Sequence, residues 1–269
     1  MLRIKNNNMQ LSFIIIEYHS IKEIISCIDS IESKVSLSHE IIISSNSCYN
    51  PKEKESIPRF NKNVHWIFNE YNGGYAYAMN RGLEFASGKH LVIMNPDCIL
   101  TNDLTSMVNF IDQHKDVGAI APQIIDNNGN IQDSVRPYIT PKRFIIRQIK
   151  RLVNKKTCVL NKHFDYSKVQ TTDWAIGAFI MISKKVYKKA KGLDENMFMY
   201  AEDAEWCTRI RSCGFEIVYY PRIQIRYEGT RRARNNRKYA WIFLKSHFHY
   251  WRKWGFFFSY PNRKKIIWE

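Results

Sequence analysis

The sequence predicts an α/β fold, in which helices flank a mostly parallel central sheet and an amphipathic helical tail follows. Short apolar runs rich in Ile and Val recur along the first part of the chain, and amphipathic or polar stretches separate them. Such runs fit strands that are buried on both faces, as in a parallel sheet covered by helices. The predicted strands are Leu11–Ile16, Glu40–Ile43, Val64–Phe68 and His90–Met94.

Helices are predicted between these strands. Residues 20–33 carry isoleucines on one helical face, and residues 75–86 have the composition of a helix. The isoleucines are Ile21, Ile24, Ile25, Ile28 and Ile31. The first half of the chain is therefore predicted to be an α/β domain of the nucleotide-binding type.

Composition narrows the possible partners. The chain has 41 Lys and Arg against 25 Asp and Glu, and its net charge of +16 favours nucleic acid, nucleotides or anionic lipid. The six cysteines form no C-x-x-C pair and suggest reduced thiols in the cytoplasm. No apolar run has the roughly 20 residues of a membrane span, and Glu17 ends the first apolar run too early for a signal peptide.

The fourth predicted strand stops at Asn95-Pro96-Asp97. In open parallel sheets, ligands bind beyond the carboxyl ends of the strands, so Asp97 is a candidate binding residue. The alternative is a plain turn, because all three residue types favour turns.

A second carboxylate lies near a predicted strand at Ala178–Ile182 and a Gly-Leu-Asp turn. Asp203 heads a helical stripe that continues through Trp206, Cys207 and Ile210, which predicts that it points inward. Glu202, Glu205 and Arg209 fall on the other side of this helix. The alternative is that Glu202 and Asp203 have no functional role and only stabilise the helix, because negative charge is favourable at the positive end of the helix dipole.

Taken together, these motifs resemble family 2 glycosyltransferases with the glycosyltransferase A (GT-A) fold, closest to the bacterial rhamnosyltransferases of surface polysaccharide (O-antigen type) synthesis. The resemblance runs from about Leu11 to Pro221. The stretches that carry it are "SFIIIEYHS", "NGGYAYAMNRGLEFASGKHLVIMNPD", "DSVRPY", "DWAIGAFIMI" and "GLDENMFMYAEDAEWCTRI".

The resemblance implies an inverting transfer of a sugar from a nucleotide donor to a saccharide acceptor. Asp97 stands where relatives carry the last carboxylate of an Asp-x-Asp motif, so it would bind a divalent cation, Mg²⁺ or Mn²⁺, that holds the donor diphosphate. Asp203 falls on the acid that acts as general base. The strand end at Asp97 and the helical stripe headed by Asp203 also point to these two residues without the resemblance.

Further site residues are implied less directly. On the donor side they are Tyr18, His19, Ser45, Asn72, Gly73, Asn80 and Arg226, with Asp97. On the acceptor side they are Trp174, Glu202 and Arg136. A tight turn at the glycines and a solvated loop arginine at Arg136 are the ordinary alternatives.

The sequence departs from the family pattern at two positions. Ser45 replaces the aspartate that usually ends the second strand and contacts the base, which leaves uridine and thymidine donors open. A late histidine near the diphosphate is also missing, and Tyr227 or Arg226 stands in its place. An arginine there could neutralise the diphosphate.

The tail is expected to form its own unit, with a catalytic domain over residues 1–230 and a basic, aromatic helical extension over 231–269. Trp241, Leu244, Phe248 and Trp251 form an apolar stripe. Either this stripe docks on the domain, or it lies on anionic lipid together with the aromatic residues 256–258.

The predicted function is transfer of L-rhamnose from dTDP-L-rhamnose to a lipid-linked saccharide, at the cytoplasmic face of the inner membrane. A UDP-hexose donor is the alternative within this class. A basic nucleic-acid-binding protein is the alternative from another class, although no recognised nucleic-acid-binding signature is present and no role would remain for Asp97 and Asp203. Nucleic acid is therefore not an expected partner.

Overall fold

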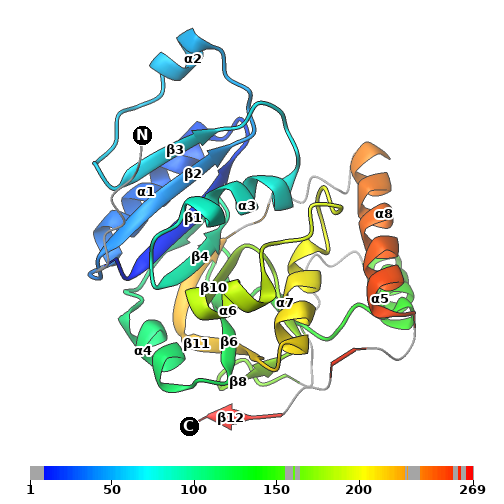
Figure 1. The fold of residues 1–269 in the computed structure, drawn as a ribbon. Helices are drawn as coiled ribbons and strands as arrows, with labels where there is room; N and C mark the ends of the chain where they lie inside the picture. Colours follow the sequence, from blue (N-terminus) through cyan, green and yellow to red (C-terminus); the bar gives the residue numbers. More distant parts are fainter. Residues whose placement is uncertain are drawn as a thin grey trace.

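The computed structural model describes residues 9–154, 160, 164–227, 229, 237–256, 260–261 and 265–268, with backbone alone for 150–154. A ten-stranded sheet forms the centre, in the order β12-β8-β11-β6-β10-β4-β1-β2-β3, with β5 paired to β11 (Figure 1). Its strands are β1 (Leu11–Glu17), β2 (His39–Ser45), β3 (Val64–Phe68), β4 (His90–Met94), β5 (Cys98–Leu100), β6 (Val117–Ile125), β8 (Val169–Thr172), β10 (Phe179–Ser183), β11 (Glu216–Tyr227) and β12 (Ile267–Trp268).

The sheet has two halves of different character. β3, β2, β1 and β4 run parallel, which confirms the predicted α/β fold with a parallel core. β10 then pairs antiparallel with β4 and with β6, and β11 returns parallel to β6. A small separate sheet pairs β7 (Val135–Arg136) with β9 (Trp174–Ala175).

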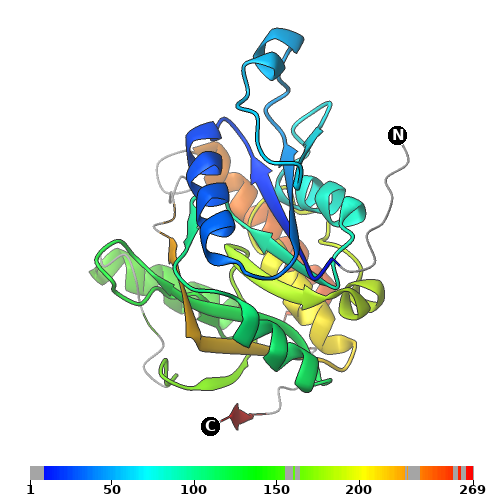
Figure 2. The same cartoon turned by 90° about the vertical axis from the view of Figure 1, so that its left-hand side faces the viewer.

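Helices cover both faces of the central sheet. The described helices are α1 (Ile21–Lys34), α2 (Pro51–Glu55), α3 (Tyr75–Phe85), α4 (Thr105–Gln113), α5 (Pro141–Asn154), α6 (Lys184–Ala190), α7 (Glu202–Ser212) and α8 (Arg237–Trp254). α1 and α4 lie over one face, whereas α3, α6 and α7 lie over the other (Figures 1 and 2).

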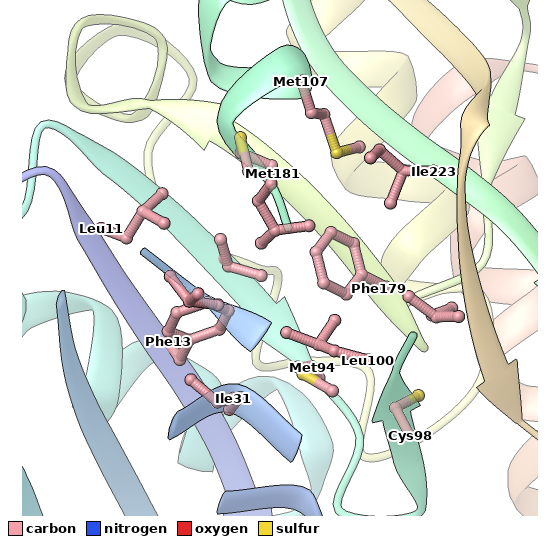
Figure 3. Packing of buried hydrophobic residues seen from close by; sticks show 14 of the residues in the cluster. Leu11, Phe13, Ile31, Met94, Cys98, Leu100, Met107, Phe179, Met181 and Ile223 are labelled. Atoms are coloured by element: carbon pink, nitrogen blue, oxygen red, sulfur yellow. The ribbon is translucent and has the colours of Figure 1, made fainter. Parts of the chain in front are cut away.

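β1 shows why its sequence forms a central strand. Leu11 and Phe13 pack into the layer under α1 and α4, and Ile14 packs into the layer under α3. Side chains alternate between the two faces of a strand, so a continuous apolar run is needed where both faces are buried. Figure 3 shows Phe13 in the first layer, with Met94 and Phe179 from the neighbouring strands β4 and β10.

The α1 face differs in detail from the prediction. Ile24, Ile28 and Ile31 are buried as expected, but Cys27 takes part in this face while Ile21 and Ile25 are only half-buried. The five described cysteines are free thiols, and Cys158 lies outside the described residues.

The C-terminal tail packs against the rest of the chain. The Tyr250 hydroxyl on α8 lies 2.9 Å from Thr208 Oγ1 on α7, and β12 adds a short strand beside β8. Among the helices that the structure describes, none combines the length and mean hydropathy that a membrane span requires.

Candidate active site

β4 ends in a hydrogen-bonded turn at Asn95-Pro96-Asp97. The Cys98 N–H donates to the Asn95 carbonyl at 3.2 Å, and β5 then runs antiparallel to β11. The Asn95 N–H donates to the Ala178 carbonyl at 3.0 Å, which ties the turn to the segment before β10. The turn interpretation is therefore correct as local structure, and it also holds the side chain of Asp97 at the tip of a central strand.

Asp97 is half-buried, and its charge acts on the groups around it. Burial and then the Asp97 carboxylate raise the pKa of the Cys27 thiol, and the same two causes raise the pKa of Cys98. Burial and then Asp97 also raise the pKa of Tyr227, whose hydroxyl accepts a hydrogen bond from Asn95 Nδ2 at 3.1 Å. The end of β4 is thus a region of negative potential.

Asp203 lies in the first turn of α7, behind a strained backbone. Tyr200 and Ala201 both have positive φ, 71° and 65°, which is uncommon for residues other than glycine and often marks a functional site. The Gly177 N–H donates to Asp203 Oδ2 at 2.9 Å, and the Ala204 N–H donates to Oδ1 at 2.8 Å. Burial raises the pKa of Asp203, while these two N–H groups and the Arg136 charge oppose the rise.

Glu202 departs from its predicted place on the outer side of α7. It is only 5% exposed, and Glu205 is fully buried, so both sides of this helix are covered. Burial, and then repulsion from Asp203, raises the pKa of Glu202 well above its usual range. Its Oε2 atom has no hydrogen-bond partner among the described residues.

Asp97 and Asp203 come together around two tyrosines. The charges of both carboxylates contribute to the raised pKa of Tyr227, after burial. The Tyr75 hydroxyl donates to the Gly177 carbonyl at 2.6 Å, next to the N–H that binds Asp203. The predicted pair of carboxylates therefore shares one side of the molecule.

Arg136 and Trp174 form a second predicted group beside Asp203. They are paired across β7 and β9, and the guanidinium lies over the indole ring, 5.2 Å from its centroid. The Arg136 side chain also donates to Asp133 Oδ2 at 3.0 Å. Trp174 is buried, and its Nε1 donates to the Pro137 carbonyl at 2.9 Å, so it supports this wall mainly through packing.

Glu17 lies at the centre of the Ser45 region, a role that no sequence pattern indicated. Glu17 is fully buried at the end of β1 and lies opposite Ser45 in the parallel register. Its Oε2 accepts from the hydroxyls of Ser45 at 2.5 Å and Ser47 at 2.8 Å, and Oε1 accepts from the Tyr49 hydroxyl at 3.0 Å. The carboxylate missing at Ser45 is thus present one strand away.

Tyr18 and His19 follow Glu17 directly and are exposed. The His19 N–H donates to Ser47 Oγ at 2.7 Å, and its ring lies at right angles to Tyr49, 6.2 Å between centroids. These aromatic rings gather at the carboxyl ends of β1 and β2, the edge where a nucleotide would bind.

Asn46, which the sequence analysis missed, links the loop after β2 to the loop between β3 and α3. Its Nδ2 donates to Asn72 Oδ1 at 3.2 Å and to the Gly74 carbonyl at 3.0 Å, and its Oδ1 accepts from Asn69 at 2.9 Å. Asn72 Oδ1 also accepts a hydrogen bond from the Gly74 N–H at 3.0 Å, so it is engaged by both loops. Gly74 has a φ of +90°, and a Cβ there would lie 2.2 Å from the Phe198 carbonyl oxygen, so a glycine is required. At the predicted Gly73, a Cβ would instead meet the Tyr77 ring at 2.4 Å.

Asn80 makes contacts that support a loop rather than the acidic pair. Its amide donates to the Leu193 carbonyl at 2.9 Å and to Glu195 at 2.7 Å, and accepts from the Leu193 N–H. It lines a hollow of about 670 Å³ whose walls include neither Asp97 nor Asp203. A contact between Asn80 and the donor remains a prediction.

Tyr227, rather than Arg226, lies beside the Asp97 turn. Successive residues of a strand point to opposite faces, and Tyr227 contacts Asn95 whereas Arg226 is exposed. Of the two residues considered for the position of the late histidine, the geometry therefore favours Tyr227.

A cation here would depend on one carboxylate. Within the described residues, no group of three His, Cys, Asp or Glu side chains could hold a metal. Mg²⁺ and Mn²⁺ accept one or two protein carboxylates when phosphates and waters complete the shell, so a half-buried Asp97 at a strand end fits such an ion.

Proteins from several organisms resemble this chain. A hexosyltransferase of low-salt glycan biosynthesis, Agl10 of Haloferax volcanii, is 26% identical over 205 residues, which is 75% of this chain and 61% of the relative. Rhamnosyltransferase WbbL of Escherichia coli is 25% identical over 138 residues, 51% of each chain. The chain thus spans between half and two-thirds of the length of these two relatives.

Solved structures share the fold at low identity. GalNAc-T7 with UDP, GalNAc and Mn²⁺ has a TM-score of 0.64 at 16% identity, covering 92% of this chain and 48% of that one. The mannosyltransferase PcManGT of Pyrobaculum calidifontis, with GDP-Man and Mn²⁺, has a TM-score of 0.58 at 13% identity, covering 93% and 66%. These likenesses show a GT-A fold.

The family profile described as Glycosyl transferase family 2 matches residues 12–189, from β1 to α6. The match includes the whole parallel half of the sheet and the Asp97 turn. The chain belongs to glycosyl transferase family 2.

Proposed function

We propose that the chain is an inverting glycosyltransferase that uses Asp97 on the donor side and Asp203 as general base. The observation that carries the proposal is that Asp203 accepts from the Gly177 N–H while the turn bearing Asp97 donates to the carbonyl of the next residue, Ala178. The family match also favours this class over a nucleic-acid-binding protein.

On the donor side, Asp97 would hold a divalent cation bound to the diphosphate. When bound, the ion would neutralise charge on the leaving group. GalNAc-T7 and PcManGT were solved with Mn²⁺ and a nucleotide or nucleotide sugar, which supports this arrangement. Tyr18, His19 and Tyr49 would flank the base of the donor nucleotide at the ends of β1 and β2.

On the acceptor side, Asp203 would take the proton of the attacking hydroxyl. Its raised pKa makes it a stronger base than an ordinary aspartate, and the two backbone N–H groups fix the carboxylate in place. Glu202, whose Oε2 lacks a partner in the described part of the chain, would be protonated and could donate to an acceptor oxygen. Arg136 and Trp174 would form the wall beside the acceptor.

For the donor we propose dTDP-L-rhamnose, and for the acceptor a lipid-linked saccharide of surface polysaccharide synthesis at the cytoplasmic face of the membrane. The likeness to WbbL supports rhamnose, whereas the likeness to Agl10 supports a hexose; a UDP-hexose is the second candidate donor. The Glu17 carboxylate supports base recognition without an aspartate at position 45, because it orients Ser45, Ser47 and Tyr49.

Replacement Asp203→Asn is expected to lower turnover by roughly 10² or more, the scale of a lost general base, while donor binding is retained. In the wild type, activity should fall as the pH drops through the raised pKa of Asp203, so the acid limb lies above the usual pKa of about 3.9 for aspartate. Rate–pH profiles check this, with Asp29→Asn on the exposed side of α1 as control. Wild-type turnover in the Asp203→Asn variant would reject the assignment of Asp203 as general base.

Replacement Asp97→Ala should abolish the Mn²⁺-dependent part of donor binding, because the cation loses its protein carboxylate. Titration calorimetry with dTDP, with and without Mn²⁺, measures this part directly. The matched control is Asp29→Ala, which leaves the site intact. An Asp97→Ala protein whose affinity rises with Mn²⁺ as in the wild type would refute the assignment.

Replacement Ser45→Asp should weaken donor binding rather than restore the family pattern. It would bury a second carboxylate against Glu17 and cost about 1–3 kcal/mol of folding stability. The double variant Glu17→Ser/Ser45→Asp moves the charge to the other strand and should recover most of the loss in both stability and donor KM. Urea unfolding and donor kinetics measure the two effects; a fully stable, active Ser45→Asp protein would contradict the role of Glu17.

A panel of dTDP-, UDP- and GDP-sugars offered with membrane extract tests the donor. We expect dTDP to be released from dTDP-L-rhamnose faster than any other nucleotide. Faster release of UDP from a UDP-hexose would replace the donor and leave the glycosyltransferase assignment in place.

A further inference from the structure

Exposed apolar side chains concentrate on two helices far from each other in the sequence. Six of the twelve large apolar residues that are exposed in the described part of the chain lie on α5 and α8. They are Ile145, Ile146, Ile149, Trp241, Leu244 and Phe248, each between 41% and 69% exposed. Scattered exposed apolar residues are ordinary, but a cluster on neighbouring helices marks an interaction surface. We name these six residues the apolar face.

The two helices are in direct contact. The ring of Phe144 on α5 lies 5.7 Å from that of Phe243 and 5.2 Å from that of Trp251, both on α8. Figure 1 shows α5 and α8 side by side at one edge of the molecule. The two helices that carry the exposed residues therefore adjoin each other, and the α8 stripe expected from the sequence supplies three of the six.

α8 docks through its other side. Ser246, His247 and Tyr250 are its buried residues, and Ser246 Oγ donates to the Met199 carbonyl at 2.8 Å. Trp241, Leu244 and Phe248, the first three residues of the predicted stripe, remain outside, while Trp251 is half-buried against α5. Burial of apolar surface drives packing, so we expect another surface to cover the side chains that this helix leaves exposed.

The charges of the side chains on α5 and α8 indicate which kind of surface covers the apolar face. The sequences of α5 and α8 each contain five Lys or Arg and no Asp or Glu. Arg147 and Lys253 are used in ion pairs with Asp133 and Asp194. Other basic residues of the two helices are exposed: Lys142, Arg143, Arg237, Lys238, Lys245 and Arg252.

We infer that the apolar face and the exposed basic residues around it dock the enzyme on an anionic lipid bilayer, with both helices lying in the interface. Apolar residues including Trp, Phe and Leu, accompanied by Lys and Arg, are the composition of helices that bind at the bilayer surface. Anionic headgroups attract such basic groups. A second copy of the chain would instead bring two equally basic surfaces together, which like charges oppose.

The surface also adjoins the proposed active site. α8 is bonded to the Met199 carbonyl, just before the strained turn that leads to Asp203, and to Thr208 on α7. Docking would thus bring the acceptor side of the site to the bilayer, which rests on the proposed lipid-linked acceptor. Binding to lipid itself does not depend on that proposal.

Co-sedimentation of the full chain with vesicles tests the inference. The vesicles are phosphatidylcholine alone or phosphatidylcholine with phosphatidylglycerol, at low and high salt. We expect the protein to bind only the vesicles that contain phosphatidylglycerol, and we expect high salt to weaken this binding. The variants Ile145→Ser/Ile149→Ser and Trp241→Ser/Phe248→Ser should each reduce this binding about 10-fold or more, because each removes two apolar side chains from the interface. The control Phe85→Ser replaces an exposed aromatic residue on α3 and should bind as the wild type.

Nucleotide release from the donor separates this test from that of the proposed function. The α5 and α8 variants should keep their circular dichroism and their rate of nucleotide release in detergent-free solution while losing vesicle binding. Wild-type vesicle binding by the α5 variant, or binding without preference for anionic lipid, would overturn the inference. Sedimentation velocity is a further measurement: a wild-type dimer that becomes a monomer in either double variant would overturn the inference, because a second copy of the chain would then cover the apolar face.

Discussion

The peptide groups around Gly177 hold the two acidic residues in one site. The Gly177 N–H binds Asp203, its carbonyl accepts from Tyr75, and the next carbonyl, of Ala178, accepts from the Asn95 N–H. A Cβ at Gly177 would lie 3.0 Å from the Tyr75 hydroxyl, a tight contact that the absence of a side chain avoids. Three peptide groups thus tie the turn after β4, α3 and α7 to the strand that separates the two halves of the sheet.

The distribution of charge follows from this arrangement. The chain as a whole carries +16, yet its proposed catalytic region is acidic, with Asp97, Glu202 and Asp203 close together. Like charges at short range raise one another's pKa, so one of a pair of buried acids remains protonated more readily. Glu202 is the more deeply buried of the pair with Asp203, and it is the one whose pKa rises well above its usual range. The excess positive charge lies elsewhere, including the surface of α5 and α8.

Much of the fold followed from periodicity alone. The four parallel strands were predicted at nearly their observed bounds, because strands buried on both faces must be continuously apolar. Asp97 and Asp203 were also proposed from pattern, one from the end of a strand and one from the face of a helix. The register that brings Tyr227 rather than Arg226 to Asn95 could not be predicted, because it depends on the pairing of β11 with β5. Glu17 was missed since its partners come from the neighbouring strand and the loop after it. Glu202 was misplaced because β9, α6 and α8 pack around α7, which no period within the helix reveals.

In the proposed mechanism, Asp97 would hold a donor-bound cation while Asp203 acts on the acceptor hydroxyl. A crystal of the protein grown with dTDP and Mn²⁺, measured at a wavelength where manganese scatters anomalously, tests it most directly. We expect a single strong anomalous peak within coordination distance of the Asp97 carboxylate. A peak in the hollow beside Asp194 and Glu195, with none at Asp97, would contradict it.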